Sequence, residues 1–75
     1  MVFETIRAML AQCLGYDESR IQEDTVILED LECTVEDLAE VLMGVEEEYG
    51  VAVPEEFWTR LSTVADLVRF VEDQM

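Results

Sequence analysis

The spacing of the apolar residues constrains this chain most, because it predicts helices and leaves almost no room for strands. Near the N-terminus the apolar side chains recur at intervals of three and four residues: Phe3, Ile6, Met9, Leu10, Cys13 and Leu14. This period places them on one face of an α-helix, and Gly15 is suited to its C-cap. We therefore predict a helix over residues 3–14, with Cys13 on its buried face.

A second long helix is predicted to begin after Thr34. Thr34 and Asp37 have the spacing of a capping box, in which the side chain of each residue bonds to the backbone amide of the other. One buried stripe is expected to follow, made of Val35, Leu38, Leu42, Val45 and Tyr49. Gly50 favours the end of this helix.

Two further helices are predicted in the last third of the chain. Pro54 suits the first turn of a short helix, because that turn needs no amide donor. The apolar side chains of this short helix are Phe57, Trp58 and Leu61. Thr63 and Asp66 repeat the capping-box spacing. The last helix follows them, with a buried face made of Val64, Leu67, Val68 and Val71.

Residues 16–32 form the longest connection. They show no helical period, but they carry isolated apolar residues: Ile21, Val26, Ile27, Leu28 and Leu31. Long loops in small domains are commonly packed by their own side chains, so we expect a loop pinned to the core. No strand pattern is longer than residues 51–53. The chain is thus predicted to be all-α, a single domain over residues 1–75 folded as a four-helix bundle with a long first loop and a short third helix.

The charge is strongly one-sided, with 19 acidic residues against four arginines and a net charge of −15. Such a field repels nucleic acids and anionic membranes and attracts basic protein surfaces. Glu36, Glu40 and Glu47 fall on the face opposite the apolar stripe of residues 35–49, with Asp37 and Glu48 beside them. Clustered carboxylates repel one another on a helix and so lower its stability. A role in binding partners would explain why this face keeps them, which makes it a candidate interaction surface.

Other classes of function lack their residues. The chain has no histidine, no lysine, no nucleophile beside a base and no glycine-rich phosphate loop, so an enzyme is not expected. It also has no calcium-loop motif. Divalent cations are expected only as loose counterions of the acids at residues 29–32 and 46–48, without a specific metal site.

The two cysteines, Cys13 and Cys33, are too few for a disulfide framework and are expected to be free thiols in a reducing compartment. The N-terminal residues lack the basic and apolar regions of a signal peptide, and no apolar stretch approaches the length of a membrane span. We therefore expect a cytoplasmic protein without a membrane partner.

Several sequence blocks resemble acyl carrier proteins over nearly the full chain. They are Leu14-Gly15-Tyr16, Leu28-Glu29-Asp30-Leu31, the run from Glu40 to Tyr49, Val53-Pro54 and the run from Leu61 to Leu67. The resemblance implies a four-helix bundle whose second helix begins with Asp-Ser-Leu. It further implies that the serine bears a phosphopantetheine arm carrying acyl thioesters, and that the acidic second helix docks onto basic patches of biosynthetic enzymes.

In this register Thr34, Val35 and Glu36 stand at the Asp-Ser-Leu positions, so the attachment motif is missing. A shift by one residue would make Thr34 the serine, but it would move Leu38 and the rest of the stripe off the core positions that the family implies. Valine has no hydroxyl to attack coenzyme A, and Thr34 is β-branched and expected to act as a cap. The acids around Cys33 should keep that thiol protonated. No bound cofactor is predicted, and 4′-phosphopantetheine is expected only if a non-standard site is used.

Six residues are the predicted partner-binding set: Glu36, Asp37, Glu40, Met43, Glu46 and Glu47. The resemblance implies acids at four of these positions, whereas Glu36 replaces an apolar residue. The favoured hypothesis is a monomeric binding or regulatory module for synthase-type enzymes of fatty-acid or polyketide biosynthesis. Two alternatives stay open. One is a genuine acyl carrier that is modified at Thr34 or Ser19 or holds acyl groups directly on Cys33, and the other is an acidic decoy of basic, nucleic-acid-binding surfaces.

Overall fold

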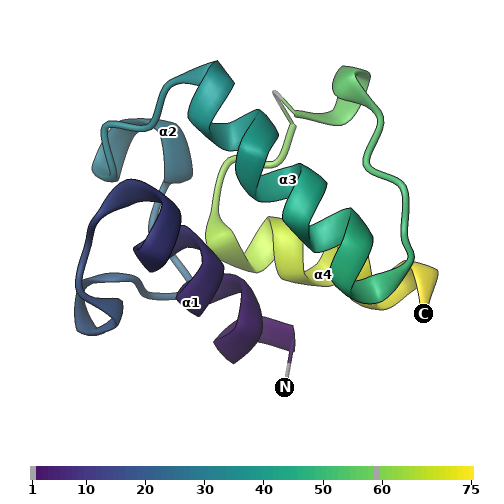
Figure 1. The fold of residues 1–75 in the computed structure, drawn as a ribbon, viewed down its shortest axis with the longest axis horizontal. Coiled ribbons are helices and arrows are strands. Elements are labelled where there is room, and N and C mark those ends of the chain that lie inside the picture. Colours follow the sequence, from purple (N-terminus) through teal and green to yellow (C-terminus); the bar gives the residue numbers. More distant parts are fainter. Residues whose placement is uncertain (1, 59) are drawn as a thin grey trace.

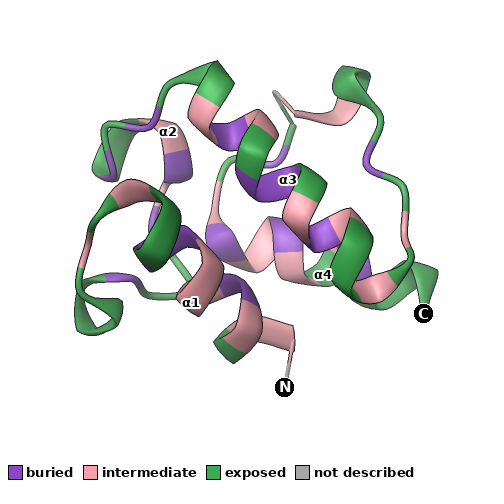
Figure 2. Ribbon diagram, viewed as in Figure 1, coloured by how far each residue is buried: buried purple, intermediate pink, exposed green. Residues whose placement is uncertain are grey.

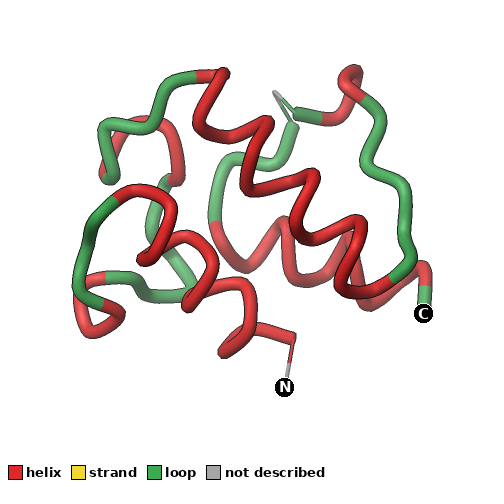
Figure 3. The backbone as a smooth tube through the Cα atoms, in the orientation of Figure 1, coloured by secondary structure: helices red, strands yellow, loops and turns green. Residues whose placement is uncertain are grey.

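The computed structural model describes residues 2–58 and 60–75, and the fold class agrees with the all-α prediction (Figure 1). Its helical elements are α1 (Val2–Leu14), η1 (Glu18–Arg20), α2 (Ile27–Asp30), α3 (Val35–Tyr49), η2 (Glu55–Phe57) and α4 (Val64–Gln74), where η marks a 3-10 turn. The described residues contain no strand beyond one isolated antiparallel bridge between Val26 and Thr63. Figure 3 shows the helices joined only by loops.

The three long helices form the core. Helix α1 contacts both α3 and α4, and in Figure 1 α1 and α3 run side by side in opposite directions. All three contribute residues with no exposed surface: Ile6 and Leu10 of α1, Leu42 and Val45 of α3, and Val64, Leu67 and Val71 of α4. Each set follows the three-and-four spacing, so the predicted apolar faces meet in one interior (Figure 2).

The connection between α1 and α3 is pinned as predicted. Ile21, Ile27 and Leu31 are buried in the core. The loop carbonyls of Thr25 and Glu23 accept hydrogen bonds from the first amides of α4, at 3.0 Å from Val64 N and 2.9 Å from Ala65 N. Because these amides have no acceptor within α4 itself, the loop satisfies the start of that helix while the helix holds the loop.

Helical turns interrupt this connection, which the sequence predicted to be irregular throughout. The η1 turn is capped by Asp17, whose carboxylate accepts from Ser19 N, and α2 follows Val26, whose amide donates to Asp30 Oδ2 at 2.9 Å. Elements of three or four residues are too short to show a helical period, so their sequences resemble those of loops.

The predicted third helix is a single 3-10 turn, η2, between Gly50 and α4. The side chains of Trp58 and Gln74 help to hold this segment in place. The indole of Trp58 donates to the carbonyl of Val53 at 3.2 Å. The carboxamide of Gln74 pairs with both polar groups of Ala52, accepting from its amide at 3.2 Å and donating to its carbonyl at 2.9 Å. Side chains thus supply bonds that a longer helix would have supplied internally.

The prediction that Cys13 is buried is wrong, because its side chain is exposed. The buried face of α1 is completed by Ala11. The helix continues to Leu14 and ends at Gly15, where the amides of Gly15 and Tyr16 both donate to the carbonyl of Ala11. Cys13 therefore lies at the margin of the buried face, with its Sγ 3.8 Å from Oε2 of Glu40 in α3.

Candidate functional site

The start of α3 is fixed by the predicted capping box. Thr34 Oγ1 accepts a hydrogen bond from Asp37 N at 3.1 Å, and Thr34 N donates to Asp37 Oδ2 at 3.4 Å. Thr34 itself has an extended backbone, with φ −81° and ψ 165°, as expected of an N-cap. The predicted capping role of this hydroxyl is confirmed.

Val35, which the sequence predicts to stand at the family's attachment position, is the first residue of α3, and 58% of its surface is exposed. The prediction that it belongs to the buried stripe is wrong. Val35 points in nearly the same direction around the helix axis as Leu42. It lies, however, in the first turn of α3, which extends past the neighbouring helices in Figure 1. The buried stripe consists of Leu38, Val41, Leu42 and Val45, so it includes Val41, which the sequence did not predict.

Cys33 precedes this turn, and its side chain is turned into the core with 6% of its surface exposed. Burial, followed by the charge of Asp37 and the proximity of Cys13, raises the pKa of its thiol to about 11. The thiol is therefore protonated at neutral pH, as predicted, although burial rather than the acidic neighbours is the larger cause. A buried, protonated thiol is a poor nucleophile for forming a thioester.

Glu32, immediately before Cys33, has φ 49°, and among the described residues it is the only one other than glycine with a positive φ. This left-handed conformation is unfavourable for a residue that bears a Cβ. It turns the chain between α2 and Cys33, and neither periodicity nor composition pointed to it.

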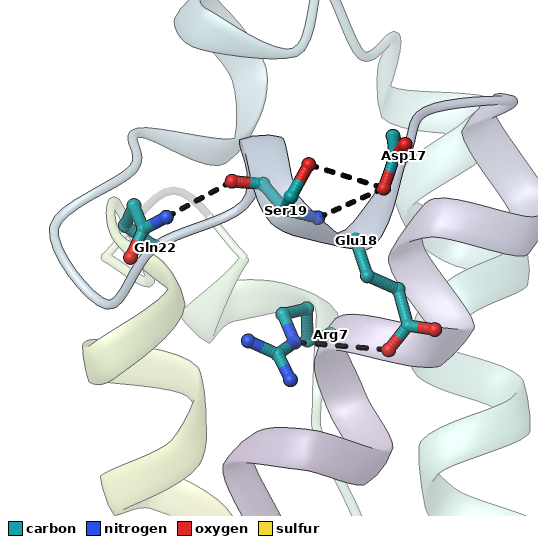
Figure 4. A network of polar contacts seen from close by, with 5 residues as sticks. All are labelled: Arg7, Asp17, Glu18, Ser19 and Gln22. Carbon is teal, nitrogen blue, oxygen red and sulfur yellow. Dashed lines mark hydrogen bonds and ion pairs between the residues drawn. The ribbon is translucent and has the colours of Figure 1, made fainter.

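Ser19 lies in η1, far along the chain from α3, and its environment is shown in Figure 4. Its hydroxyl donates to Asp17 Oδ1 at 3.1 Å, and its carbonyl accepts from Gln22 Nε2 at 3.0 Å. Arg7 of α1 meets the neighbouring Glu18, with 3.7 Å between Nε and Oε1. Ser19 thus offers an exposed hydroxyl on a different part of the surface from Val35.

Four of the six predicted partner-binding residues lie together on the outer face of α3. Glu36, Glu40, Met43 and Glu47 are all exposed, and Met43 has 61% of its surface accessible. Their spacing of four, three and four residues forms one line along the helix. We call these four residues the α3 stripe.

The other two predicted residues flank the α3 stripe and have bonds within the protein. Asp37 is half-buried and closes the capping box. Glu46 is half-buried as well, and its Oε2 accepts from Val53 N at 3.2 Å, which holds the segment that leaves α3. Their carboxylates therefore stabilise the two ends of the helix.

The arginines do not neutralise the α3 stripe. Arg7, Arg20 and Arg60 each lie over an aromatic ring of their own segment, at 5.1 to 5.8 Å from Phe3, Tyr16 and Phe57. Within residues 2–58 and 60–75 the single ion pair is that between Arg7 and Glu18, and no group of three or more potential ligands is arranged to hold a metal ion. The stripe is an uncompensated acidic surface with one exposed methionine.

Comparison with known proteins agrees with this architecture. The profile of the family described as "Phosphopantetheine attachment site" matches residues 4–71. The acyl carrier protein of Thermotoga maritima is 31% identical over 74 residues, 99% of this chain and 91% of the relative. That of Helicobacter pylori is 32% identical over 72 residues, covering 96% of this chain and 92% of the relative. The chain belongs to the acyl carrier protein family.

Members of the acyl carrier protein family are carriers that work with acyl-processing enzymes, and they are not enzymes themselves. Their domain can carry 4′-phosphopantetheine. No helix among the described residues is long and apolar enough to cross a membrane.

The start of α3 does not fit attachment of the phosphopantetheine group. Val35 ends in two methyl groups and offers no oxygen to phosphorylate. Its neighbours do not replace it, since the Thr34 hydroxyl caps the helix and the Cys33 thiol is buried. Residues 33–35 therefore offer no free nucleophile for the cofactor, and the sequence predicts that Val35 stands at the attachment position of the family.

Proposed function

We propose that this protein is a carrier-fold binding module that docks through the α3 stripe onto basic surfaces of acyl-processing enzymes and bears no phosphopantetheine at residue 35. The observation that carries the proposal is the exposed Val35 at the head of an intact acidic helix. Loss of the attachment residue removes the carrying chemistry but leaves an acidic docking face, in which Glu36 stands where the resemblance implies an apolar residue.

Charge supports the docking role. With a net charge of −15 and no basic residue on α3, the protein is attracted to basic partners over long distances, and the association rate falls as salt is added. Met43 adds an apolar contact in the centre of the stripe, where a flexible thioether adapts to different surfaces. The expected partners are enzymes of fatty-acid or polyketide biosynthesis. We expect the protein to bind them in the cytoplasm as a monomer with a single domain.

The absence of modification can be tested directly. The purified protein is incubated with coenzyme A and a broad-specificity phosphopantetheinyl transferase, and its intact mass is measured. We expect no change for the natural sequence. The triple variant T34D/V35S/E36L, which restores Asp-Ser-Leu, is expected to gain one phosphopantetheine and serves as the positive control.

Peptide mapping distinguishes the alternative of a genuine carrier modified elsewhere. If the natural protein gains the group, the modified peptide would identify Thr34, Ser19 or Cys33 as the site, and the unmodified module would be excluded. Protein purified from its own cells should be mapped in the same way.

Docking can be tested with charge reversals. Glu36 and Glu47 have exposed side chains, so E36K/E47K should fold normally. We expect the dissociation constant for a basic acyl-processing enzyme to rise about tenfold or more at low salt, because two repulsive charge pairs replace two attractive ones. The matched control E55K/E56K makes the same change in net charge on exposed residues of η2. Equal losses in both variants would argue against a defined docking face.

A further inference from the structure

Two hollows lie end to end between α1 and α3, on the side of α3 that faces away from Glu46. They measure about 370 and 250 Å³, and Met9 and Gln12 line both of them. Together they form one groove along α1 from Glu4 to Cys13, a distance of about 13 Å at the α-helical rise. Three turns of another helix would span it.

The groove has apolar lining residues from both helices, beside the polar side chains of Thr5 and Gln12, and Met9 makes its centre adaptable. Ala8 and Val41 are small or branched apolar residues on facing helices. A Cβ on Gly44 would lie 2.8 Å from Met9 Cε, so the methionine occupies the space that this glycine leaves open. An unbranched thioether can move and adjust to a bound side chain at small cost.

The rim of the groove is acidic at both ends. Glu4 and Glu48 stand at one end and Glu40 at the other, where its Oε2 lies 3.8 Å from Cys13 Sγ. No arginine is among the described residues that line either hollow. The rim therefore complements a cationic partner, and it repels a second copy of this chain, which would present the same acidic surface.

From this geometry we infer that the α1–α3 groove binds a basic amphipathic helix of a partner protein. Apolar residues of that helix would lie over Ala8, Met9 and Val41, and its lysine or arginine side chains would reach Glu4, Glu40 and Glu48. A helix in an apolar groove with complementary charges at the rim is a general mode of peptide recognition. The groove is a second surface, separate from the α3 stripe except for the shared Glu40.

The probe for the test is a 14-residue leucine and lysine peptide with one apolar face, titrated into the full chain at low salt. A leucine and glutamate peptide of the same pattern and a scrambled leucine and lysine peptide are the controls. We expect saturable binding of the basic amphipathic peptide alone. Amide shifts should concentrate at Ala8, Met9, Cys13 and Val41.

Variants then locate the site. E4Q/E48Q should raise the dissociation constant about fivefold by removing two exposed ion pairs, whereas E55Q/E56Q, with the same change in charge, should raise it less than about twofold. G44A keeps the helix, because alanine is the better helix former, and it pushes Met9 into the groove. It should weaken the peptide without changing the fold.

Three outcomes would overturn the inference: no saturable binding, equal losses in the two double variants, or shifts confined to Glu36, Met43 and Glu47. The last outcome would assign the peptide to the α3 stripe. Because E36K/E47K leaves the groove intact, failure of the groove and failure of the proposed docking face give different results.

Discussion

Helices α3 and α4 begin with the same pattern, Thr-Val-x-Asp, and they begin in nearly the same way. In both capping boxes the Asp amide donates to Thr Oγ1 at 3.1 Å, while the Thr amide lies 3.4 Å from the Asp carboxylate in α3 and 3.2 Å in α4. Two matching sequences therefore give two matching local structures, and any difference in role must come from what surrounds them.

Their surroundings are reversed. At α4 the first helical residue, Val64, has no exposed surface, and Ser62 before the cap is exposed. At α3 the first helical residue, Val35, is 58% exposed, and Cys33 before the cap is buried. The chain thus enters one helix from outside the core and the other from inside it.

The backbone amides follow the same division. The first amides of α4 donate to the loop carbonyls at residues 25 and 23, whereas no protein acceptor is found among the described residues for the amides of Val35 and Glu36. The start of α4 at residues 63–65, which we call the covered start, contributes to stability. The start of α3 at residues 34–36, which we call the open start, is free for contact with other molecules. The resemblance predicts that the attachment position of the family lies at this open start.

The first prediction compares the two valines. V64A should lower the free energy of unfolding by about 2 to 3 kcal/mol, because it removes a fully buried side chain, and V35A should change it by less than about 0.5 kcal/mol. Urea unfolding followed by circular dichroism measures both. Similar losses would mean that Val35 is covered in solution.

The second prediction concerns the buried side of the open start. The pKa of Cys33 is raised in the folded protein to about 11, so the stabilisation from its neutral thiol is complete below the unfolded pKa of about 9 and is lost as pH rises toward 11. By pH 11 the natural protein should lose about 2 kcal/mol relative to C33A. Unfolding measured from pH 7 to 11 tests this, and parallel curves for the two proteins would contradict it.

The third prediction compares the caps. T34A and T63A should each cost about 1 kcal/mol, since each removes the acceptor of an N-terminal amide. T63A should cost more, because Thr63 is half-buried and supports the loop contacts, while Thr34 is exposed. Thermal unfolding of both variants measures the order. A larger loss for T34A would show that the open start is the more constrained one.

The smallest effect is expected at Glu32. E32G should raise the free energy of unfolding by about 0.5 kcal/mol, because glycine adopts φ 49° without strain but gains freedom in the unfolded chain. E29G, in the ordinary helical backbone of α2, is the control and should lower stability. A loss in both variants would indicate that the Glu32 side chain makes a compensating contact.

The sequence predicted those features that depend on neighbours along the chain. Periodicity identified α1, α3 and α4, and the Thr and Asp spacing identified both caps, because these features form within a few residues. That Val35 stands at the attachment position is implied by the resemblance and stays a prediction.

Features that depend on distant segments were missed. Periodicity gives the direction of a side chain around its helix but not what lies beyond the helix end, so Val35 and Cys13 were predicted to be buried. Nor did the pattern predict that the Glu46 carboxylate would accept a hydrogen bond from the amide of Val53. This bond draws the Glu46 side chain away from the exposed face. The exposed α3 stripe was recognisable, but the groove beside it needed the packing of α1.

The carboxamide of Gln74 behaves toward Ala52 as a neighbouring peptide group would, with one bond to the amide and one to the carbonyl. Tension applied at the end of α4 would therefore pass into the segment that follows α3 as well as along the helix. The end of α4 and the segment after α3 would therefore unfold together under a mechanical pull. In Q74A the end of α4 should fray by itself.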